Sequence, residues 1–368
     1  MSPTIGIYLH IPFCKQKCAY CDFFSGKGDD AAYERYTAAL AERIRERGSR
    51  AGERVESVYF GGGTPSVLGT QRLCRLLDSV RQSFALDDGA EVTLEANPES
   101  GKRLDFSALR RHGFNRLSVG LQSAVPQELS FLGRIHSPEE AALTVRLARR
   151  AGFENLSLDL MMGIPRQTAD SLRRSIDFCL DCGVKHLSCY LLKIEKGTRF
   201  DSIKEQLSLP DEDEQAQLYL SAAAYLEAHG LRQYEISNFS FPGFESRHNT
   251  RYWKCGEYIG LGPAAHSFYH GRRSHCARSL TDFYRDRIID DGPGGDEEEF
   301  IMLALRLKTG LVFAEYAQRF GRELPGFTLQ KLRRYADAGF MELDEDHACF
   351  TPKGFLVSNT ILSDILPS

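Results

Sequence analysis

The sequence predicts an α/β fold in which six β–α units form a parallel sheet and a smaller module follows at the C-terminus. Two observations support this. Short apolar runs alternate with amphipathic stretches over the first two-thirds of the 368 residues, which is typical of parallel strands joined by right-handed helical crossovers. After about residue 210 the alternation stops. An open sheet and a curved, partial barrel both fit this pattern.

The apolar runs and the stretches between them give the expected elements. Six strands are expected, at Ile5–Ile11, Val55–Phe60, Glu91–Ala96, Arg116–Gly120, Asn155–Met161 and His186–Leu192. Helical periodicity is clearest between them at Ala31–Gly48, Thr70–Phe84, Pro138–Ala151 and Thr168–Cys182.

Polar or glycine residues follow nearly every expected strand, and this favours a barrel. The first strand ends in a cysteine-rich loop. The others end in Gly61-Gly62-Gly63-Thr64-Pro65, in Glu95 and Asn97, in Gln122 and in Asp159. In α/β barrels the catalytic rim is built at the carboxyl ends of the strands. We therefore expect a site at the rim of a partial (β/α)6 barrel.

The remainder of the chain predicts two further parts. Asp211–Gly230 reads as a helix whose acidic start suits a helix N-terminus. Irregular sequence follows to about residue 276, and residues 290–296 look like a linker. Beyond it, helices are expected at Glu297–Gly310, Val312–Phe320 and Thr328–Ala338, with a hairpin at residues 340–343 and 348–351. We therefore expect a barrel at 1–210, an extension at 211–290 and a winged-helix-like domain at 291–368.

Composition excludes several classes of protein. There are 46 basic and 50 acidic residues, with a net charge of −4, and the C-terminal module has no basic recognition face. Nucleic acid is therefore not expected as a partner. No apolar stretch is long enough for a transmembrane segment, and the first residues run directly into a strand pattern, so no leader peptide is expected. Ten cysteines without a secretory signal favour a reducing, cytoplasmic location.

Three cysteines predict a metal cluster. Cys14, Cys18 and Cys21 follow the first strand with the spacing C-x3-C-x2-C. Cubane iron–sulfur clusters normally have four cysteine ligands, so three thiolates leave one iron open to S-adenosylmethionine (SAM). This is the radical-SAM signature, in which an electron enters the sulfonium of SAM. Structural zinc prefers paired C-x2-C units, and no second pair lies where it is needed.

A second C-x2-C, Cys179 and Cys182, ends a helical pattern that stops at Gly183. Positions i and i+3 share one face of a helix, so buried small thiols explain the pair better than a metal site.

Several rim residues suit SAM by their chemistry. Three consecutive glycines permit close approach of backbone carbonyls to its amino group. Glu95 and Asp159 can accept hydrogen bonds from ribose hydroxyls or an ammonium group, and Arg134 can pair with a carboxylate. Each is more often a surface or capping residue when it stands alone. The place of the glycines, Glu95 and Asp159 at the ends of strands favours a ligand.

Four motifs resemble the oxygen-independent coproporphyrinogen III oxidase family of radical-SAM proteins. They are Tyr8-x-His10-Ile11-Pro12-Phe13 with the three cysteines, Gly61–Pro65, Gly120-Leu121-Gln122-Ser123 and Asp159–Thr168. The resemblance covers essentially the whole chain and implies a radical-SAM partial barrel with a winged-helix-like appendage over its opening. It implies SAM contacts from Tyr8, Gly62, Gly63, Thr64, Glu95, Gln122, Arg134 and Asp159.

Two departures point to one branch of that family. Phe23 stands where the oxidase has an extra cysteine, and only 13 residues precede Cys14 where the oxidase has a long arm. Both features match the HemW branch, understood as haem chaperones that bind haem and hand it to acceptor proteins. His248-Asn249-Thr250-Arg251-Tyr252-Trp253 matches the H-N-x-x-Y-W of that branch. The resemblance implies haem as cargo, acceptor proteins and an electron donor of unknown identity, and a cytoplasmic protein that meets the membrane surface during delivery.

His248 is the expected haem ligand by this resemblance. A neutral imidazole is a standard axial ligand of haem iron, and neighbouring aromatic rings suit a porphyrin face. The hexapeptide alone is better explained by a hydrogen-bonded histidine and a packed Trp253, and the family resemblance reverses that balance. His266 is the rival ligand. Two enzyme alternatives stay open: decarboxylation of coproporphyrinogen III to protoporphyrinogen IX, and another SAM-dependent radical reaction on a porphyrin.

Overall fold

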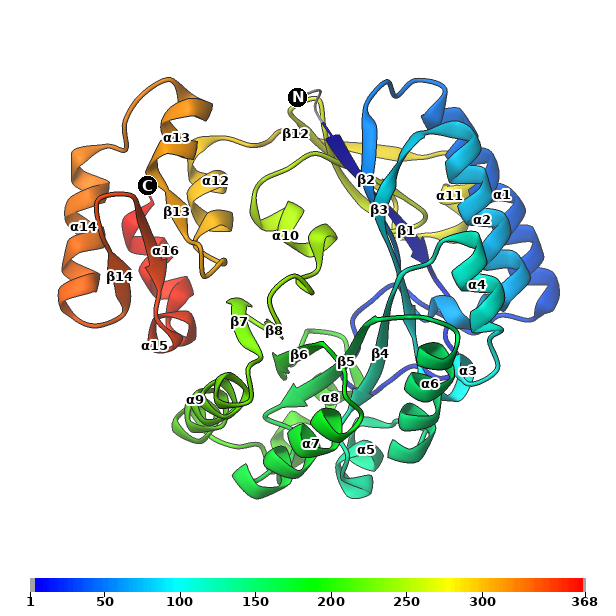
Figure 1. The fold of residues 1–368 in the computed structure, drawn as a ribbon, viewed down its shortest axis with the longest axis horizontal. Coiled ribbons are helices and arrows are strands. Elements are labelled where there is room, and N and C mark those ends of the chain that lie inside the picture. The colour runs from blue at the N-terminus through cyan, green and yellow to red at the C-terminus, as the bar shows by residue number, and fades with distance from the viewer. Residues whose placement is uncertain (1–3, 367–368) are drawn as a thin grey trace.

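A twelve-stranded sheet forms the centre of the molecule (Figure 1). The computed structural model describes residues 4–366. The strand order is β12-β11-β10-β9-β1-β2-β3-β4-β5-β6-β8-β7. The first six strands are parallel neighbours in chain order: β1 (Thr4–Ile11), β2 (Arg54–Gly62), β3 (Ala85–Ala96), β4 (Arg116–Gln122), β5 (Asn155–Met162) and β6 (His186–Leu191). The predicted α/β fold is confirmed, and the linear strand order makes the barrel a partial one.

Helices cover the outer face of this sheet (Figure 1). The longer ones are α1 (Asp30–Gly48), α2 (Thr70–Ser83), α4 (Phe106–His112), α5 (Pro126–Leu132), α6 (Pro138–Arg150) and α7 (Ala169–Asp181). Short turns of helix are η1 (Pro65–Leu68), α3 (Pro98–Gly101), α8 (Arg199–Ser202) and η2 (Lys204–Gln206). In α1 the buried residues include Tyr36, Leu40 and Ile44, whose spacing of four presents one apolar stripe to the sheet.

The expected strand and helix boundaries agree closely with the structure except at β3 and in the expected helix Glu297–Gly310, which ends at Ala304. That strand begins at Ala85, six residues before the expected Glu91. Its first five residues are at least partly exposed, so the apolar pattern that marks a buried strand starts only farther along.

The segment expected to be irregular up to residue 276 contains five short strands, so that prediction is wrong. It contains β7 (Arg232–Glu235), β8 (Asn238–Ser240), β9 (Tyr258–Leu261), β10 (His266–Tyr269) and β11 (Arg272–Cys276). Strands of three to five residues are too short for their alternation to be recognised in the sequence. β9 runs parallel to β1 and β8 runs antiparallel to β6, so this segment adds strands to both edges of the barrel sheet.

The linker expected at residues 290–296 is wrong for residues 290–293, which lie in a strand, and only residues 294–296 connect that strand to the next helix. β12 (Ile288–Pro293) pairs with β11 and forms the outer edge of the sheet. The sequence of β12 has the glycine and aspartates typical of a linker. An edge strand that is almost wholly exposed does not need an apolar face.

Three helices lie between residues 211 and 290. The long one is α9 (Glu212–Ala228), whose N-cap Asp211 and Glu214 form a capping box. The short ones are α10 (Arg247–Trp253) and α11 (Leu280–Tyr284). The start of α10 is fixed by Glu91 of β3, because its carboxylate accepts 3.0 Å hydrogen bonds from the backbone N–H groups of Arg247 and His248.

The C-terminal part forms its own layer beside the barrel (Figure 1). It contains α12 (Glu297–Ala304), β13 (Leu311–Val312), α13 (Phe313–Phe320), α14 (Gly326–Asp337), β14 (Met341–Leu343), β15 (His347–Phe350), α15 (Pro352–Leu356) and α16 (Ser358–Ile365). The hairpin of β14 and β15 is extended by β13 into an antiparallel sheet. Backbone bonds from Ile236 to Arg306 and from Lys308 to Tyr234 join this part to the barrel.

Across residues 4–366, no helix combines the length and the apolar character that crossing a membrane would require.

Candidate functional site

A cavity of about 330 Å³ lies at the carboxyl ends of the parallel strands. The thiol-bearing residues Cys14, Cys18 and Cys21 line one part of it. The rest of the lining includes Gly62, Gly63, Thr64, Glu95, Asn97, Gln122, Arg134, Asp159, Met161 and Tyr190. The structure therefore brings the three cysteines together with all of the expected SAM contacts except Tyr8.

Backbone hydrogen bonds close the loop that carries the three cysteines. The N–H of Cys14 donates to the carbonyl of Gly26 at 2.9 Å, and the N–H of Gly26 donates to Pro12 at 3.0 Å. Cys14 is buried, while Cys18 and Cys21 are partly exposed. Burial raises the pKa of the Cys18 and Cys21 thiols, and Arg134 opposes that shift at Cys18. Three thiols around one cavity fit a cluster, because its iron supplies the positive charge that favours thiolates.

The glycine loop is fastened directly onto the cysteine loop. The N–H groups of Gly63 and Thr64 donate to the carbonyls of Ile11 and Phe13, each at 2.8 Å. Gly62 has φ +106°, and a Cβ there would lie 2.6 Å from the His10 ring. A Cβ on Gly63 would lie 2.7 Å from the Phe13 carbonyl oxygen. Both glycines are therefore required by this close approach.

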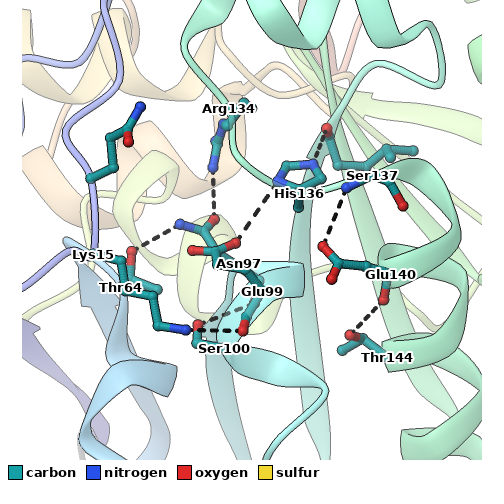
Figure 2. A network of polar contacts seen from close by, with 12 residues as sticks. Lys15, Thr64, Asn97, Glu99, Ser100, Arg134, His136, Ser137, Glu140 and Thr144 are labelled. Carbon is teal, nitrogen blue, oxygen red and sulfur yellow. Dashed lines mark hydrogen bonds and ion pairs between the residues drawn. The ribbon is translucent and has the colours of Figure 1, made fainter.

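A polar network connects the glycine loop to Arg134 (Figure 2). Asn97 donates from Nδ2 to the Thr64 hydroxyl at 2.9 Å and accepts at Oδ1 from Arg134 Nη1 at 2.8 Å. Arg134 Nη2 donates to the Tyr20 hydroxyl at 2.8 Å. Within the described residues, the buried Arg134 Nε has no hydrogen-bond partner. An anionic group entering the cavity would satisfy that donor.

Two carboxyl groups, those of Glu95 and Asp159, also line the cavity. The Tyr59 hydroxyl donates to Glu95 at 2.7 Å, and the Ser118 hydroxyl donates to Asp159 at 2.9 Å. Burial raises the pKa of Glu95 to about 7, and the nearby charge of Asp159 adds to that shift. Burial also raises the pKa of Asp159. These acids can accept hydrogen bonds from a ligand hydroxyl or ammonium group, and a cationic ligand would favour their ionised forms.

Gln122 and Tyr8 occupy different depths of the barrel. Gln122 ends β4 with φ +70°, at a register shift against β5, and such an irregularity re-aims a side chain. Tyr8 lies behind the glycine loop, because a Cβ on Gly61 would be 3.0 Å from the Tyr8 ring. Its hydroxyl is 3.1 Å from His10 Nδ1.

His248 is enclosed in the barrel interior. It is wholly buried on α10, with Nδ1 2.8 Å from the Ser57 hydroxyl and Nε2 2.7 Å from the Tyr252 hydroxyl. Burial lowers its pKa to about 3, so the ring is neutral. Both ring nitrogens are engaged, and a metal bond to either requires one hydrogen bond to break.

His266 has a different environment. It is exposed on β10, with its ring 5.0 Å from that of His275. Partial burial and the neighbouring His275 lower its pKa.

Sequence reasoning gave no role to Asn97 or Tyr20. In the sequence Asn97 is only a polar residue at the end of a strand, whereas in the structure it joins Thr64 to Arg134. Tyr20 lies between the second and third cysteines, and that position was the available signal. Cys179 and Cys182 lie away from the cavity: Cys179 is fully buried in the core and Cys182 is packed against it.

Comparison with known proteins agrees with this geometry. The Radical SAM superfamily model matches residues 8–179 and the HemN C-terminal domain model matches residues 297–357. The haem chaperone HemW of Mycobacterium tuberculosis is 41% identical, covering 98% of this chain and 94% of the relative. HemW of Bacillus subtilis is 34% identical, covering 98% of both. HemW of Escherichia coli is 37% identical, covering 83% of both.

Among solved structures, coproporphyrinogen III oxidase (HemN) from Escherichia coli has a TM-score of 0.83 with 22% identity, covering 99% of this chain and 90% of that one. At this identity the likeness establishes the fold alone: a radical-SAM barrel with a separate C-terminal domain.

Proposed function

Because this chain belongs to the HemW family of radical-SAM proteins, we propose that it binds haem and transfers it to acceptor proteins. The observation that carries the proposal is the full-length similarity to haem chaperones together with a cavity that fits the radical-SAM cofactors. We also propose a cytoplasmic location, with contact to the membrane surface during delivery. All ten cysteines are free thiols, which suits a reducing compartment.

The residues of the cavity fit a [4Fe–4S] cluster and SAM. We assign the cluster to Cys14, Cys18 and Cys21. When bound, the cluster and SAM supply one-electron chemistry. The unpartnered Nε of Arg134 suits the carboxylate of SAM, while Glu95 and Asp159 suit its hydroxyl and ammonium groups. The rest of the proposed SAM contacts come from Gly62, Gly63, Thr64 and Gln122, with Tyr8 supporting the loop from behind.

His248 is the proposed axial ligand, and its binding to haem requires α10 to move. In the structure described here, His248 Nε2 is hydrogen-bonded to the Tyr252 hydroxyl. Haem ligation through that nitrogen therefore depends on release of this bond. His266 is the rival ligand and needs no such opening because it is already exposed.

The oxidase reaction is the alternative function, and Phe23 argues against it. Its side chain is 66% exposed beside the cysteine loop and lines the cavity. By family resemblance the oxidase has a cysteine at this position, and a phenyl ring cannot replace a thiol as ligand or nucleophile.

One anaerobically reconstituted sample tests the two functions together. Haem titration should give a saturable Soret shift, because an axial nitrogen changes the electronic environment of the iron. The same sample, given SAM, a reductant and coproporphyrinogen III, should yield no decarboxylated product. A genuine oxidase run in parallel is the control, and comparable turnover by the two proteins would refute the chaperone proposal.

A further inference from the structure

Three potential metal-binding side chains meet on the outer strands of the sheet, outside the cavity described above. They are His266 of β10, His275 of β11 and Asp291 of β12. One ligand atom from each lies within 4.8 Å of the others. His266 and Asp291 are exposed and His275 is half-buried, so an ion from solvent can reach all three.

The register of β10, β11 and β12 brings these three residues together. His266 and His275 are direct partners in the antiparallel pair of β10 and β11, and their rings stack 5.0 Å apart at 25°. Asp291 is the extra residue of a β-bulge, because Arg273 pairs with Gly292 while Ser274 pairs with Asp290. A bulge turns its extra residue out of the ladder. The Asp291 carboxylate thereby comes within 2.8 Å of His275 Nδ1.

We propose that His266, His275 and Asp291 bind one divalent transition-metal ion of the zinc class. Two imidazoles and a carboxylate are a donor set that zinc accepts, with a fourth position left for water. Ligand atoms around a tetrahedral zinc lie about 3.3 Å apart, given bond lengths of about 2.0 Å. The three atoms lie within 4.8 Å of one another, so binding requires the side chains to rotate until the atoms reach the tetrahedral spacing. This site goes beyond the proposed haem function and does not depend on it.

A simple histidine–aspartate hydrogen bond explains only two members of the cluster. The same pairing occurs at His347 and Asp344, where Nδ1 and the carboxylate are 3.0 Å apart. There, within the described part of the chain, no third ligand completes a group of three. His266 is what distinguishes the proposed site, and His347→Ala is therefore a matched control. Bound metal would tie β10, β11 and β12 together at the edge of the sheet.

The test uses cluster-loaded, haem-free protein so that the three cluster thiols are occupied. Calorimetric titration with Zn²⁺ should detect one equivalent that is lost in His266→Ala and in His275→Ala and retained in His347→Ala. Asp291→Asn, which keeps the side-chain shape, should weaken binding at least tenfold. Zn²⁺ should also slow hydrogen exchange of residues 266–293 in the wild type but not in the His266→Ala variant.

Equal Zn²⁺ stoichiometry and affinity in the wild type and in the double variant His266→Ala/His275→Ala would overturn the proposal. Because haem is absent, this result is independent of whether the chain binds haem.

Discussion

At the residue scale, the three cysteines are the first assignment to test. Changing Cys14, Cys18 or Cys21 to Ser removes one thiolate and should abolish the broad charge-transfer absorbance and most of the bound iron after reconstitution. The double change of Cys179 and Cys182 is the control and should leave the iron content unaltered, because these thiols lie in or against the core. Loss of iron in that double variant would show the assignment to be wrong.

The raised pKa of Glu95 gives a pH dependence to SAM binding. Only its carboxylate attracts a cationic ligand, and its pKa of about 7 means that this form is lost as pH falls below neutrality. SAM should perturb the electron paramagnetic resonance spectrum of the reduced cluster less strongly at pH 6 than at pH 8. Glu95→Gln should remove the difference between the two pH values, and Arg134→Ala should weaken the perturbation at both. A spectrum unchanged by saturating SAM would count against the site.

At the element scale, the glycine loop should be required to hold the cysteine loop in place. Gly62→Ala forces a Cβ to within 2.6 Å of His10 at φ +106°, so we expect lower stability by more than about 2 kcal/mol and reduced iron content. Gly69→Ala is the matched control, since its φ is +78° but nothing lies within 4 Å of the added Cβ. It should cost only the backbone strain, about 1–3 kcal/mol, and should keep its iron. Equal iron loss in Gly62→Ala and Gly69→Ala would show that the close contact between Gly62 and His10 is not what holds the cysteine loop.

The helix α10 carries a second prediction at this scale. Tyr252→Phe removes the hydroxyl bonded to His248 Nε2, which should cost about 1–3 kcal/mol of stability and tighten haem binding, because the ligand atom is already free. His248→Ala should reduce or alter the Soret shift. If His266→Ala removes the shift and His248→Ala does not, the ligand is His266 and the chaperone proposal stands.

At the scale of the whole molecule, Glu235 lies where the barrel joins the C-terminal domain. It is 1% exposed, next to the backbone bonds that Tyr234 and Ile236 make with that domain. Burial raises its pKa from 4.5 to about 7. An acid whose folded pKa is raised is destabilised by ionisation, so its contribution to stability falls as pH rises from about 4.5 to about 7.

Between these two pH values the protein should lose about 3 kcal/mol of folding stability, because each pKa unit corresponds to about 1.36 kcal/mol. Glu235→Gln should lack this decrease, and chemical denaturation at pH 4.5 and pH 8 measures the difference between the two proteins. Parallel pH dependences in the wild type and the variant would contradict the assignment.

The six β–α units, the meeting of Cys14, Cys18 and Cys21 and most of the cavity lining could be predicted from the sequence. Apolar runs mark buried strands, and parallel strands bring their carboxyl ends to one edge, so residues such as Glu95 and Asp159 were expected to meet without knowledge of any contact. The three cysteines share one short loop, and their proximity is fixed by covalent connection.

The surroundings of His248 and the meeting of His266, His275 and Asp291 depend on contacts between distant segments and could not be predicted from the sequence. His248 is enclosed by Ser57, 191 residues away in the chain. The second group depends on the register of short strands and on a bulge that no local pattern predicts. Pairing between segments distant in sequence is selected by the free energy of the whole fold, because short, exposed strands have little intrinsic preference of their own.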